Sequence, residues 1–539
     1  MIHPGSTKRI AAAATPLSVP ATPGPVWRAD RGDGTYRNPV LFADYSDPDV
    51  IRVGHDFWLT SSSFSHVPGL PILHSHDLVN WTLVNHALPG LVPVEHFSRP
   101  RHGQGVWAPA IRHHAGKFWI TYPDPDFGIY AITADDPRGS WSKPRCVLPG
   151  KGLIDPCPFW DDDGTGYLIH GWAKSRSGIS NRLTLYQLGD DNVSVAGAGT
   201  VVIDGSALEG WHTIEGPKLY RRGGYYYVFA PAGGVKNGYQ AVFRARHLRG
   251  PYEIRIVLAQ GATPVNGPHQ GAWVDTPAGE DWFLHYQELP AYGRVVHLQP
   301  MRWQDDWPVI GDDANGDGTG EPVLAHRKPI ALRTTPTAPA TSDDFDRAPL
   351  GPQWQWQANP QPGWATLDAP LSRLRLACVP RPAATLWLAS NLLLQKFPAA
   401  AFQVTSDVEL DARTEGDEAG LIVFGYSYAW IGVRQIAGAL VLVHAVCLGA
   451  NLGGAERVLH SRPVYAPRIC LRAAVKADAR CQFSYSVDGA TFTLLDGVFQ
   501  CTSSDWVGAK LGLFASSPPE AKKSGSATID RFEIVPLSP

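Results

Sequence analysis

No stretch of the 539-residue sequence contains about 18 consecutive apolar residues, the length that a membrane-spanning helix requires. Neither sign of charge is in excess, because 47 Lys and Arg stand against 50 Asp and Glu and leave a net charge of −3. The basic residues are scattered along the chain, so we expect it to bind neither nucleic acid nor a membrane surface. We therefore expect the protein to bind an uncharged molecule.

Cysteine is scarce, with seven residues in the whole chain, and methionine is scarcer, with two. The cysteines are odd in number, dispersed, and nowhere arranged as C-x-x-C. They therefore indicate neither a disulfide framework nor a zinc site.

A clear export signal is also missing from the N-terminus. Residues 1–34 hold one basic pair, a short alanine stretch and several prolines, and this apolar stretch is too short and weak for a signal peptide. We interpret these residues as a flexible leader. This interpretation favours a cytoplasmic protein, with export through a truncated signal as the alternative, and the sequence leaves the oligomeric state open.

Aromatic residues, by contrast, are abundant: the chain has 19 Trp, 18 Tyr and 19 Phe. Aromatic rings fill hydrophobic cores, and their faces also stack on the apolar faces of sugar rings. The length and the 44 % hydrophobic content predict a globular protein of two to four domains.

Five segments share one pattern, in which a short β-type run leads through a Gly- or Asp-rich turn into an aromatic-rich run. They are residues 47–64, 107–124, 155–172, 215–232 and 269–286. Each reads as a β-hairpin, and their starts lie about 50 to 60 residues apart, which is enough for a four-stranded unit. This period without convincing helices predicts a five-bladed β-propeller over residues 35–325.

A stretch rich in Pro and Thr, residues 326–342, has the composition of a linker. Beyond it, residues 343–539 contain evenly spaced strand candidates such as "AGLIVFGYSYAWIGVRQ" and "AKLGLFASS", separated by turn signals. This pattern predicts a C-terminal β-sandwich of the jelly-roll or concanavalin-like type, and an all-β protein as a whole.

In a propeller the first strands of the blades surround one mouth of the central channel. The corresponding first positions here are Asp47, Trp107, Asp155, Glu215 and His269. Topology would therefore bring three carboxyl groups together, although they lie far apart in the sequence. Carboxylates crowded in a partly enclosed pocket cannot all remain ionised, and a carboxylic acid beside a carboxylate is what glycosidic hydrolysis needs.

Four ordered blocks of the chain carry a family resemblance. They are "YRNPVLFADYSDPDVIRVGHDFWL", "GVWAPAIRHHAGKFWITY", "LIDPCPFWDDDGTGYL" and "IEGPKLYRRGGYYYVFAPAGG". The sequence resembles glycoside hydrolase family 43, in particular its β-xylosidase and α-L-arabinofuranosidase branch with a C-terminal sandwich. The resemblance implies an inverting glycosidase acting on arabinoxylan and related pentose polymers.

Carried over residue by residue, the resemblance implies roles for the three acids. Asp47 matches the general base, Asp155 the residue that orients the acid and modulates its pKa, and Glu215 the general acid. The neighbouring Asp49 occupies a position that need not be acidic, and we interpret it as a turn residue.

The resemblance also implies residues that contact the sugar. Phe64 and Trp107 match aromatic walls of the pocket, Arg294 matches an arginine near substrate and carboxylates, and Trp506 matches an aromatic sent over the propeller mouth by the sandwich. His269 matches a histidine that binds calcium through water in relatives. The chemistry itself requires no cofactor, and calcium is expected at most as a structural ion.

We therefore expect an exo-acting, inverting glycoside hydrolase that releases terminal xylose or arabinose from xylo-oligosaccharides or arabinoxylan. β-Xylosidase is favoured, and α-L-arabinofuranosidase is the alternative, because His66 stands where some xylosidases carry a bulky aromatic residue. A non-catalytic carbohydrate-binding propeller is a further alternative, although it would be expected to lose the acids that are all present here. A retaining fructosidase would carry a different opening motif.

Overall fold

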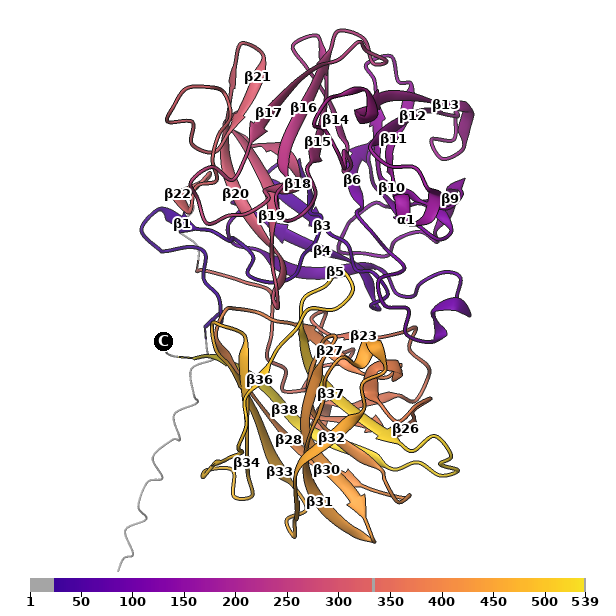
Figure 1. The fold of residues 1–539 in the computed structure, drawn as a ribbon, viewed down its shortest axis with the longest axis vertical. Coiled ribbons are helices and arrows are strands. Elements are labelled where there is room, and N and C mark those ends of the chain that lie inside the picture. Colours follow the sequence, from indigo (N-terminus) through magenta and orange to yellow (C-terminus); the bar gives the residue numbers. More distant parts are fainter. Residues whose placement is uncertain (1–23, 332–334, 538–539) are drawn as a thin grey trace, which may run out of the picture.

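The computed structural model describes residues 24–331 and 335–537. Figure 1 shows two β-domains stacked along the long axis, the propeller above and the sandwich below. The fold is therefore all-β, as the sequence predicts. The leader prediction falls largely on residues 1–23, which lie outside the described residues.

Five four-stranded antiparallel sheets form the propeller, each with its strands in chain order. Blade 1 consists of β2 (Asp49–Val53), β3 (Asp56–Thr60), β4 (Gly69–Ser75) and β5 (Thr82–Leu88). Blade 2 consists of β6 (Ala110–His114), β7 (Lys117–Asp124), β8 (Gly128–Ala134) and β9 (Arg145–Pro149). Blade 3 consists of β10 (Leu153–Trp160), β11 (Gly166–Trp172), β12 (Arg182–Leu188) and β13 (Val195–Asp204). Blade 4 consists of β14 (Lys218–Arg222), β15 (Tyr225–Ala232), β16 (Tyr239–Ala245) and β17 (Glu253–Leu258). Blade 5 consists of β18 (His269–Asp275), β19 (Asp281–Leu289), β20 (Gly293–Gln304) and β21 (Trp307–Ile310).

The five predicted hairpins are the first two strands of the five blades. In blade 4, Arg222 pairs with Tyr225 across a two-residue turn, and both turn residues, Gly223 and Gly224, have positive φ (58° and 77°). Such a turn matches the twist of the strands and suits glycine, which has no Cβ to clash. Local turn chemistry thus fixes the register of the strands that line the channel.

Hydrophobic cores lie between neighbouring blades, which explains why both faces of most strands are apolar. Phe57 and Leu59 of blade 1 pack with Trp282 and Leu284 of blade 5 in one continuous buried cluster. Equivalent clusters join the remaining neighbours. Each blade is thereby held by the two beside it, and the first positions of the inner strands are fixed around the mouth.

The two ends of the propeller meet in a small sheet of β1 (Thr35–Arg37) and β22 (Ala325–Arg327). Beside it the buried ammonium of Lys328 forms ion pairs with Asp30 at 2.6 Å and Asp77 at 2.8 Å. The described end of the predicted leader and the start of the predicted linker therefore contact each other and blade 1.

The C-terminal domain packs two eight-stranded sheets face to face. One sheet contains β23 (Gln355–Trp356), β26 (Val379–Pro380), β27 (Leu393–Lys396), β29 (Glu418–Phe424), β30 (Tyr428–Ile436), β31 (Ala439–Cys447), β32 (Glu456–Pro463) and β37 (Lys510–Ser517). The other contains β24 (Ala365–Asp368), β25 (Arg373–Ala377), β28 (Phe402–Asp411), β33 (Ile469–Val475), β34 (Arg480–Ser486), β35 (Thr493–Leu494), β36 (Phe499–Gln500) and β38 (Ser526–Pro536).

Helix is a minor component of the described residues. It comprises α1 (Lys174–Ser177) and the 3-10 turns η1 (His96–Ser98), η2 (Gly205–Ala207), η3 (Ala369–Leu371), η4 (Leu386–Leu388) and η5 (Ala450–Leu452). None of these described helices has the length and apolarity needed to span a bilayer. All seven cysteines are unpaired.

The sandwich and the propeller share a hydrophobic core. Phe42, Tyr292 and Val295 of the propeller belong to the same buried cluster as the sandwich interior. The Tyr292 hydroxyl donates to the carbonyl oxygen of Ala400 at 2.8 Å. Because burying this apolar surface is the main favourable term in such contacts, the sandwich is an integral part of the molecule.

Candidate active site

Three acids from three blades lie at the mouth of the channel that faces the sandwich. Asp47 lies two residues before β2, Asp155 is the third residue of β10, and Glu215 lies three residues before β14. Asp47 and Asp155 both have φ of 55°, in the left-handed region that is uncommon for residues other than glycine. Strain of this kind concentrates at functional sites, and here it recurs at equivalent positions of two blades.

Asp47 is held by two side-chain donors. The Arg294 guanidinium donates to its Oδ1 at 2.9 Å, and the Ser62 hydroxyl donates to its Oδ2 at 2.5 Å. Arg294 itself is only 5 % exposed, so its charge is well shielded from solvent. The two donors hold the Asp47 carboxyl group in one orientation.

Asp155 and Glu215 lie side by side. The backbone N–H of Gly216, next to Glu215, donates to Asp155 Oδ2 at 2.7 Å. A Cβ added to Gly171 would lie 3.6 Å from Asp155 Oδ2 and 3.7 Å from Glu215 Cα. Asp155 therefore fixes the backbone that carries Glu215.

The environment raises the pKa of both neighbouring acids. Burial is the main cause of the raised pKa of Asp155, and the negative charge of Asp47 adds to it. Burial also raises the pKa of Glu215, with a further contribution from the charge of Asp155. The Glu215 side chain retains 23 % exposure, so water and substrate can still reach it. Glu215 is thus suited to remain protonated near neutral pH.

His269 is fully buried beside Glu215. Its Nδ1 lies 3.1 Å from the Tyr286 hydroxyl, and its Nε2 has no hydrogen-bond partner and lies 3.6 Å from Glu215 Oε1. Burial and the charge of Arg294 lower the pKa of His269 to about 3, so its imidazole is neutral.

Calcium prefers six to eight oxygen ligands, whereas the His269 ring offers nitrogen. In the described part of the chain, His269 belongs to no group of three or more His, Cys, Asp or Glu with converging ligand atoms. Direct coordination by these residues therefore does not fit. Calcium held through water stays a prediction, and no step of the chemistry depends on it.

A cavity of about 960 Å³ opens between the mouth of the propeller and the sandwich. The propeller lines it with residues 102–104, 176, 235–237, 266, 288–290, 293 and 294, and the sandwich lines it with 426 and 503–507. This volume suits an oligosaccharide end. An apolar cavity elsewhere between the domains, beside Phe42 and Lys396, measures only about 50 Å³ and is too small for a sugar.

Aromatic side chains converge beside this cavity. The ring of Trp506, which is 47 % exposed, lies 5.7 Å from the ring of Trp107 and 5.6 Å from the Arg294 guanidinium carbon. The ring of Phe64 lies 6.3 Å from that of Trp107 but is only 3 % exposed. The structure therefore brings all four predicted sugar-contacting residues together, with Phe64 behind Trp107 rather than on the surface.

The loop that carries Trp506 is anchored to the propeller. Asp44 accepts from the backbone N–H of Gly508 at 2.9 Å with one oxygen and from that of Arg294 at 3.0 Å with the other. Trp506 has φ of 64°, which is strained for a bulky residue. One propeller carboxylate thus positions both the sandwich loop and the arginine that contacts Asp47.

Several residues of the site escaped sequence reasoning. Ser62 and Asp44 have no motif of their own. Gln270 follows His269, is 3 % exposed, has φ of 38°, and packs its side chain against Gly216 beside Asp155. The glycine that follows in "HQG" was the only local hint of an unusual backbone at Gln270.

The interpretation of Asp49 as a turn residue is wrong. Asp49 begins β2, is fully buried, and pairs with Arg112 at 2.7 Å while accepting from the backbone N–H of Ile111. His66 is also buried. Its Nδ1 lies 3.2 Å from the carbonyl oxygen of Ser63.

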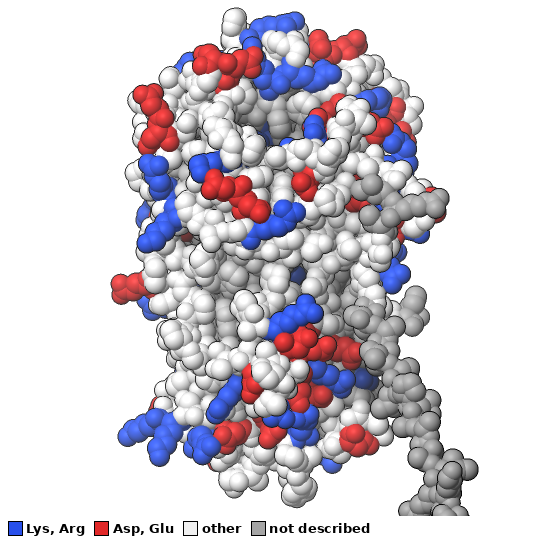
Figure 2. Space-filling view, turned by 180° about the vertical axis from the view of Figure 1, so that it is seen from behind, with Lys and Arg blue, Asp and Glu red and all other residues white. Residues whose placement is uncertain are grey.

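Charged side chains on the surface are intermixed. On the face shown in Figure 2, Lys and Arg alternate with Asp and Glu, and no large area of one sign is present. The cavity is lined by Trp506 and Arg294, and through them it adjoins Trp107 and the Asp47 carboxylate; aromatic rings beside crowded carboxyl groups, on a face without a dominant charge, are typical of a site for neutral sugars. Fold and site together define a glycoside hydrolase built on a propeller.

The chain belongs to glycosyl hydrolases family 43, whose family model matches residues 36–308. A second model, the beta xylosidase C-terminal Concanavalin A-like domain, matches residues 342–535.

A putative beta-xylosidase of Xylanibacter ruminicola is 36 % identical over 90 % of this chain and 86 % of its own length. A beta-xylosidase of Formosa agariphila is 30 % identical over 93 % of this chain and 90 % of its own. The crystal structure of a mutant of the GH43 protein BlXynB from Bacillus licheniformis superposes with a TM-score of 0.81 at 26 % identity, covering 93 % of this chain and all of that one. The family and the sandwich type are thus those that the sequence blocks indicated, and the protein is a glycosidase.

Proposed function

We propose that this glycosidase is an exo-acting, inverting β-xylosidase that removes terminal xylose from xylo-oligosaccharides. The observation that carries the proposal is the cavity at the propeller mouth, which the sandwich loop 503–507 closes on one side. A groove open at both ends would accept the middle of a polymer. A cavity closed by a second domain favours the end of a short chain.

The three acids have the environments that an inverting mechanism requires. Asp47, held by Arg294 and Ser62, would act as the general base and deprotonate the water that attacks the anomeric carbon. Glu215, whose pKa is raised by burial and by Asp155, would donate a proton to the leaving oxygen. Asp155 would hold Glu215 in place through the Gly216 N–H.

Sugar recognition would use the aromatic residues and the arginine. Trp107 and Trp506 offer ring faces or edges to the apolar side of a pyranose, and Arg294 has an Nε whose nearest acid, Glu288, lies 3.8 Å away, beyond hydrogen-bond distance. An unpaired donor in a buried guanidinium is costly unless a ligand uses it. A sugar hydroxyl is the group that we expect there.

The named relatives support xylose as the sugar, since both are described as beta-xylosidases, one of them as putative. The test compares aryl β-D-xyloside, aryl α-L-arabinofuranoside and xylobiose under identical conditions. We expect the highest kcat/KM among the aryl glycosides for the xyloside and complete conversion of xylobiose to xylose. A higher value for the arabinofuranoside would make the protein an arabinofuranosidase with the same site.

Two measurements test the exo action and the stereochemistry. Xylotriose reduced at its reducing end should release free xylose and reduced xylobiose first, whereas internal cleavage would also yield xylobiose at once. Proton NMR early in the reaction should show α-xylose, the inverted anomer. Initial β-xylose would require a covalent intermediate and would exclude Asp47 as a general base acting on water.

A further inference from the structure

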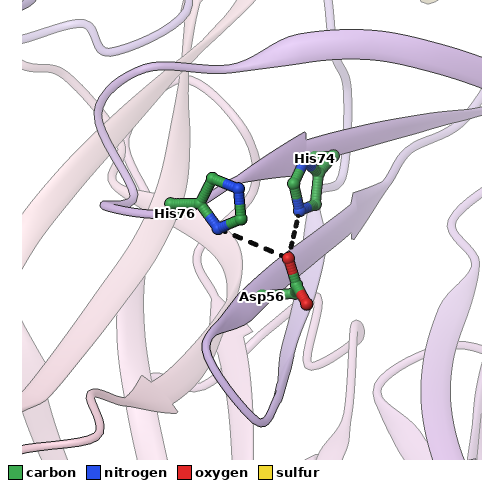
Figure 3. Close-up of side chains that lie close together, drawn as sticks. All are labelled: Asp56, His74 and His76. Carbon is green, nitrogen blue, oxygen red and sulfur yellow. Dashed lines mark hydrogen bonds and ion pairs between the residues drawn. The ribbon is translucent and has the colours of Figure 1, made fainter. Parts of the chain in front are cut away.

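A second group of ligand-type side chains lies on blade 1, away from the three acids. Asp47 precedes one end of β2, and Asp56 follows the hairpin turn at the other end, so the two aspartates lie at opposite ends of that strand. Asp56 faces two histidines of β4 and its end, His74 and His76. Figure 3 shows both imidazole rings directed at the Asp56 carboxylate.

Strand geometry produces this convergence. His74 and His76 are two residues apart and therefore lie on the same face of the chain, because side chains of a strand alternate. Trp58 pairs with His74 across the β3–β4 ladder, which places Asp56 on that face as well. Asp56 Oδ1 lies 2.6 Å from His74 Nε2 and 3.3 Å from His76 Nδ1.

We propose that Asp56, His74 and His76 bind a divalent transition-metal ion, with Zn²⁺ as the ion that best fits the ligands. One ligand atom of each residue lies within 4.8 Å of the others, and no other such group of three exists among the described residues. Two imidazole nitrogens and one carboxylate oxygen are ligands that zinc uses, at about 2.0–2.2 Å, and water can complete the tetrahedron.

Exposure at the site is graded from inside to outside. The side chains of His74, Asp56 and His76 are 12 %, 38 % and 58 % exposed. His74 is fixed by packing, since its ring lies 4.5 Å from that of Trp58. One ligand is therefore preorganised, while the open side leaves an entry path for a hydrated ion.

Without a metal, the two imidazole rings compete for one carboxylate oxygen. Both imidazoles approach the same oxygen of Asp56, and an Arg138 guanidinium nitrogen lies 3.3 Å from His74 Nε2. The Arg138 guanidinium also lies 4.5 Å from the centre of the Trp58 ring. The positive charge of Arg138 would repel a metal cation bound by His74, so we expect this residue to weaken metal binding.

The test is calorimetric titration of the full-length, chelator-treated protein with ZnCl₂. We expect one site that His76→Ala weakens by at least about 10-fold, since even residues that only support a metal ligand typically change affinity by 10- to 100-fold. His55→Ala is the matched control, because His55 is an exposed neighbour of Asp56 outside the group, and it should leave the affinity unchanged. Arg138→Ala should tighten binding.

An independent readout is anomalous diffraction at the zinc edge from crystals grown with ZnCl₂. The expected peak lies between His74 Nε2, His76 Nδ1 and Asp56 Oδ1. Wild-type titration indistinguishable from that of His76→Ala, or a peak only at other residues, would overturn the proposal. His76→Ala should leave kcat/KM for aryl xyloside unchanged, so this outcome is independent of the proposed function.

Discussion

Two levels of the propeller channel contain a similar Arg–Asp pair in different surroundings. At the mouth, Asp47 pairs with Arg294 at 2.9 Å, and two further carboxyl groups, Asp155 and Glu215, crowd the same space. Deeper in the channel, Asp49 pairs with Arg112 at 2.7 Å. Arg112 also contacts Cys157 and the Tyr220 ring.

The difference lies in the balance of charges and partners. The deeper pair is one acid with one base, in which Asp49 is fully buried with one oxygen, Oδ1, lacking a hydrogen-bond partner, and the Arg112 side chain is 13 % exposed. At the mouth, acids outnumber the arginine, and His269 Nε2 and Arg294 Nε have only carboxylate oxygens at 3.6 and 3.8 Å beside them, beyond hydrogen-bond distance. A buried ion pair by itself thus does not indicate catalysis, whereas several acids crowded together beside a cavity, with raised pKa values, do.

The strongest expected effect is the loss of activity in Glu215→Gln and Asp47→Asn, each by about 10²- to 10⁴-fold in kcat. The melting temperature of Glu215→Gln should change little, because the amide has the same shape, whereas Asp47→Asn also removes the charge that pairs with the buried Arg294 and should lower it. The two variants can be distinguished with an aryl xyloside whose leaving group needs no proton. Glu215→Gln should recover much of its rate on that substrate, and Asp47→Asn should not.

Asp49→Ala is the matching change in the deeper pair. It leaves the Arg112 charge buried without its partner, which should lower the free energy of unfolding by about 3–5 kcal/mol. Urea denaturation measures the change, and the fraction that remains folded should keep a kcat/KM close to wild type. A stable variant that is inactive would instead place Asp49 in the catalytic machinery.

Trp506→Ala should lower kcat/KM for xylobiose by about tenfold, or ~1.4 kcal/mol of transition-state binding. Its ring is 47 % exposed, so the melting temperature should be nearly unaffected. Trp506→Phe keeps an aromatic ring and should restore most of the loss. If Trp506→Ala instead lowers the melting temperature strongly, as removal of a core residue does, Trp506 contributes to stability rather than to substrate binding.

The smallest expected effect is a shift of the pH profile. Catalysis requires protonated Glu215, so kcat/KM should fall as pH rises through its raised pKa. Asp155→Asn removes a negative charge that contributes to this pKa. The alkaline limb should therefore move to lower pH, in addition to any loss of rate. An unchanged alkaline limb would show that Asp155 acts on Glu215 by position alone.

Much of the architecture could be predicted from repetition in the sequence. Five similar hairpins at a regular spacing indicate a propeller, and topology then brings Asp47, Asp155 and Glu215 to one mouth. The interpretation of Asp49 failed because Asp next to Pro is an ordinary turn signal, and its partner Arg112 lies in another blade. Long-range pairing of this kind leaves no local pattern.

The supporting residues of the site were hidden for the same reason. Asp44 acts on Gly508 and Arg294, which are 464 and 250 residues away in the chain. Gln270 packs against Gly216, a residue of another blade connection that lies 54 positions earlier in the chain. Sequence repeats specify where strands begin, whereas these contacts depend on how separate blades and domains meet.

The double contact of Asp44 has a consequence for biosynthesis. The propeller leaves the ribosome before the loop that contains Gly508, so newly made propeller holds Asp44 with only one of its two backbone donors. Trp506 arrives with the same late segment. We therefore expect nascent chains to reach full affinity for sugar-chain ends only once the sandwich has docked, so that full activity is gained late in translation.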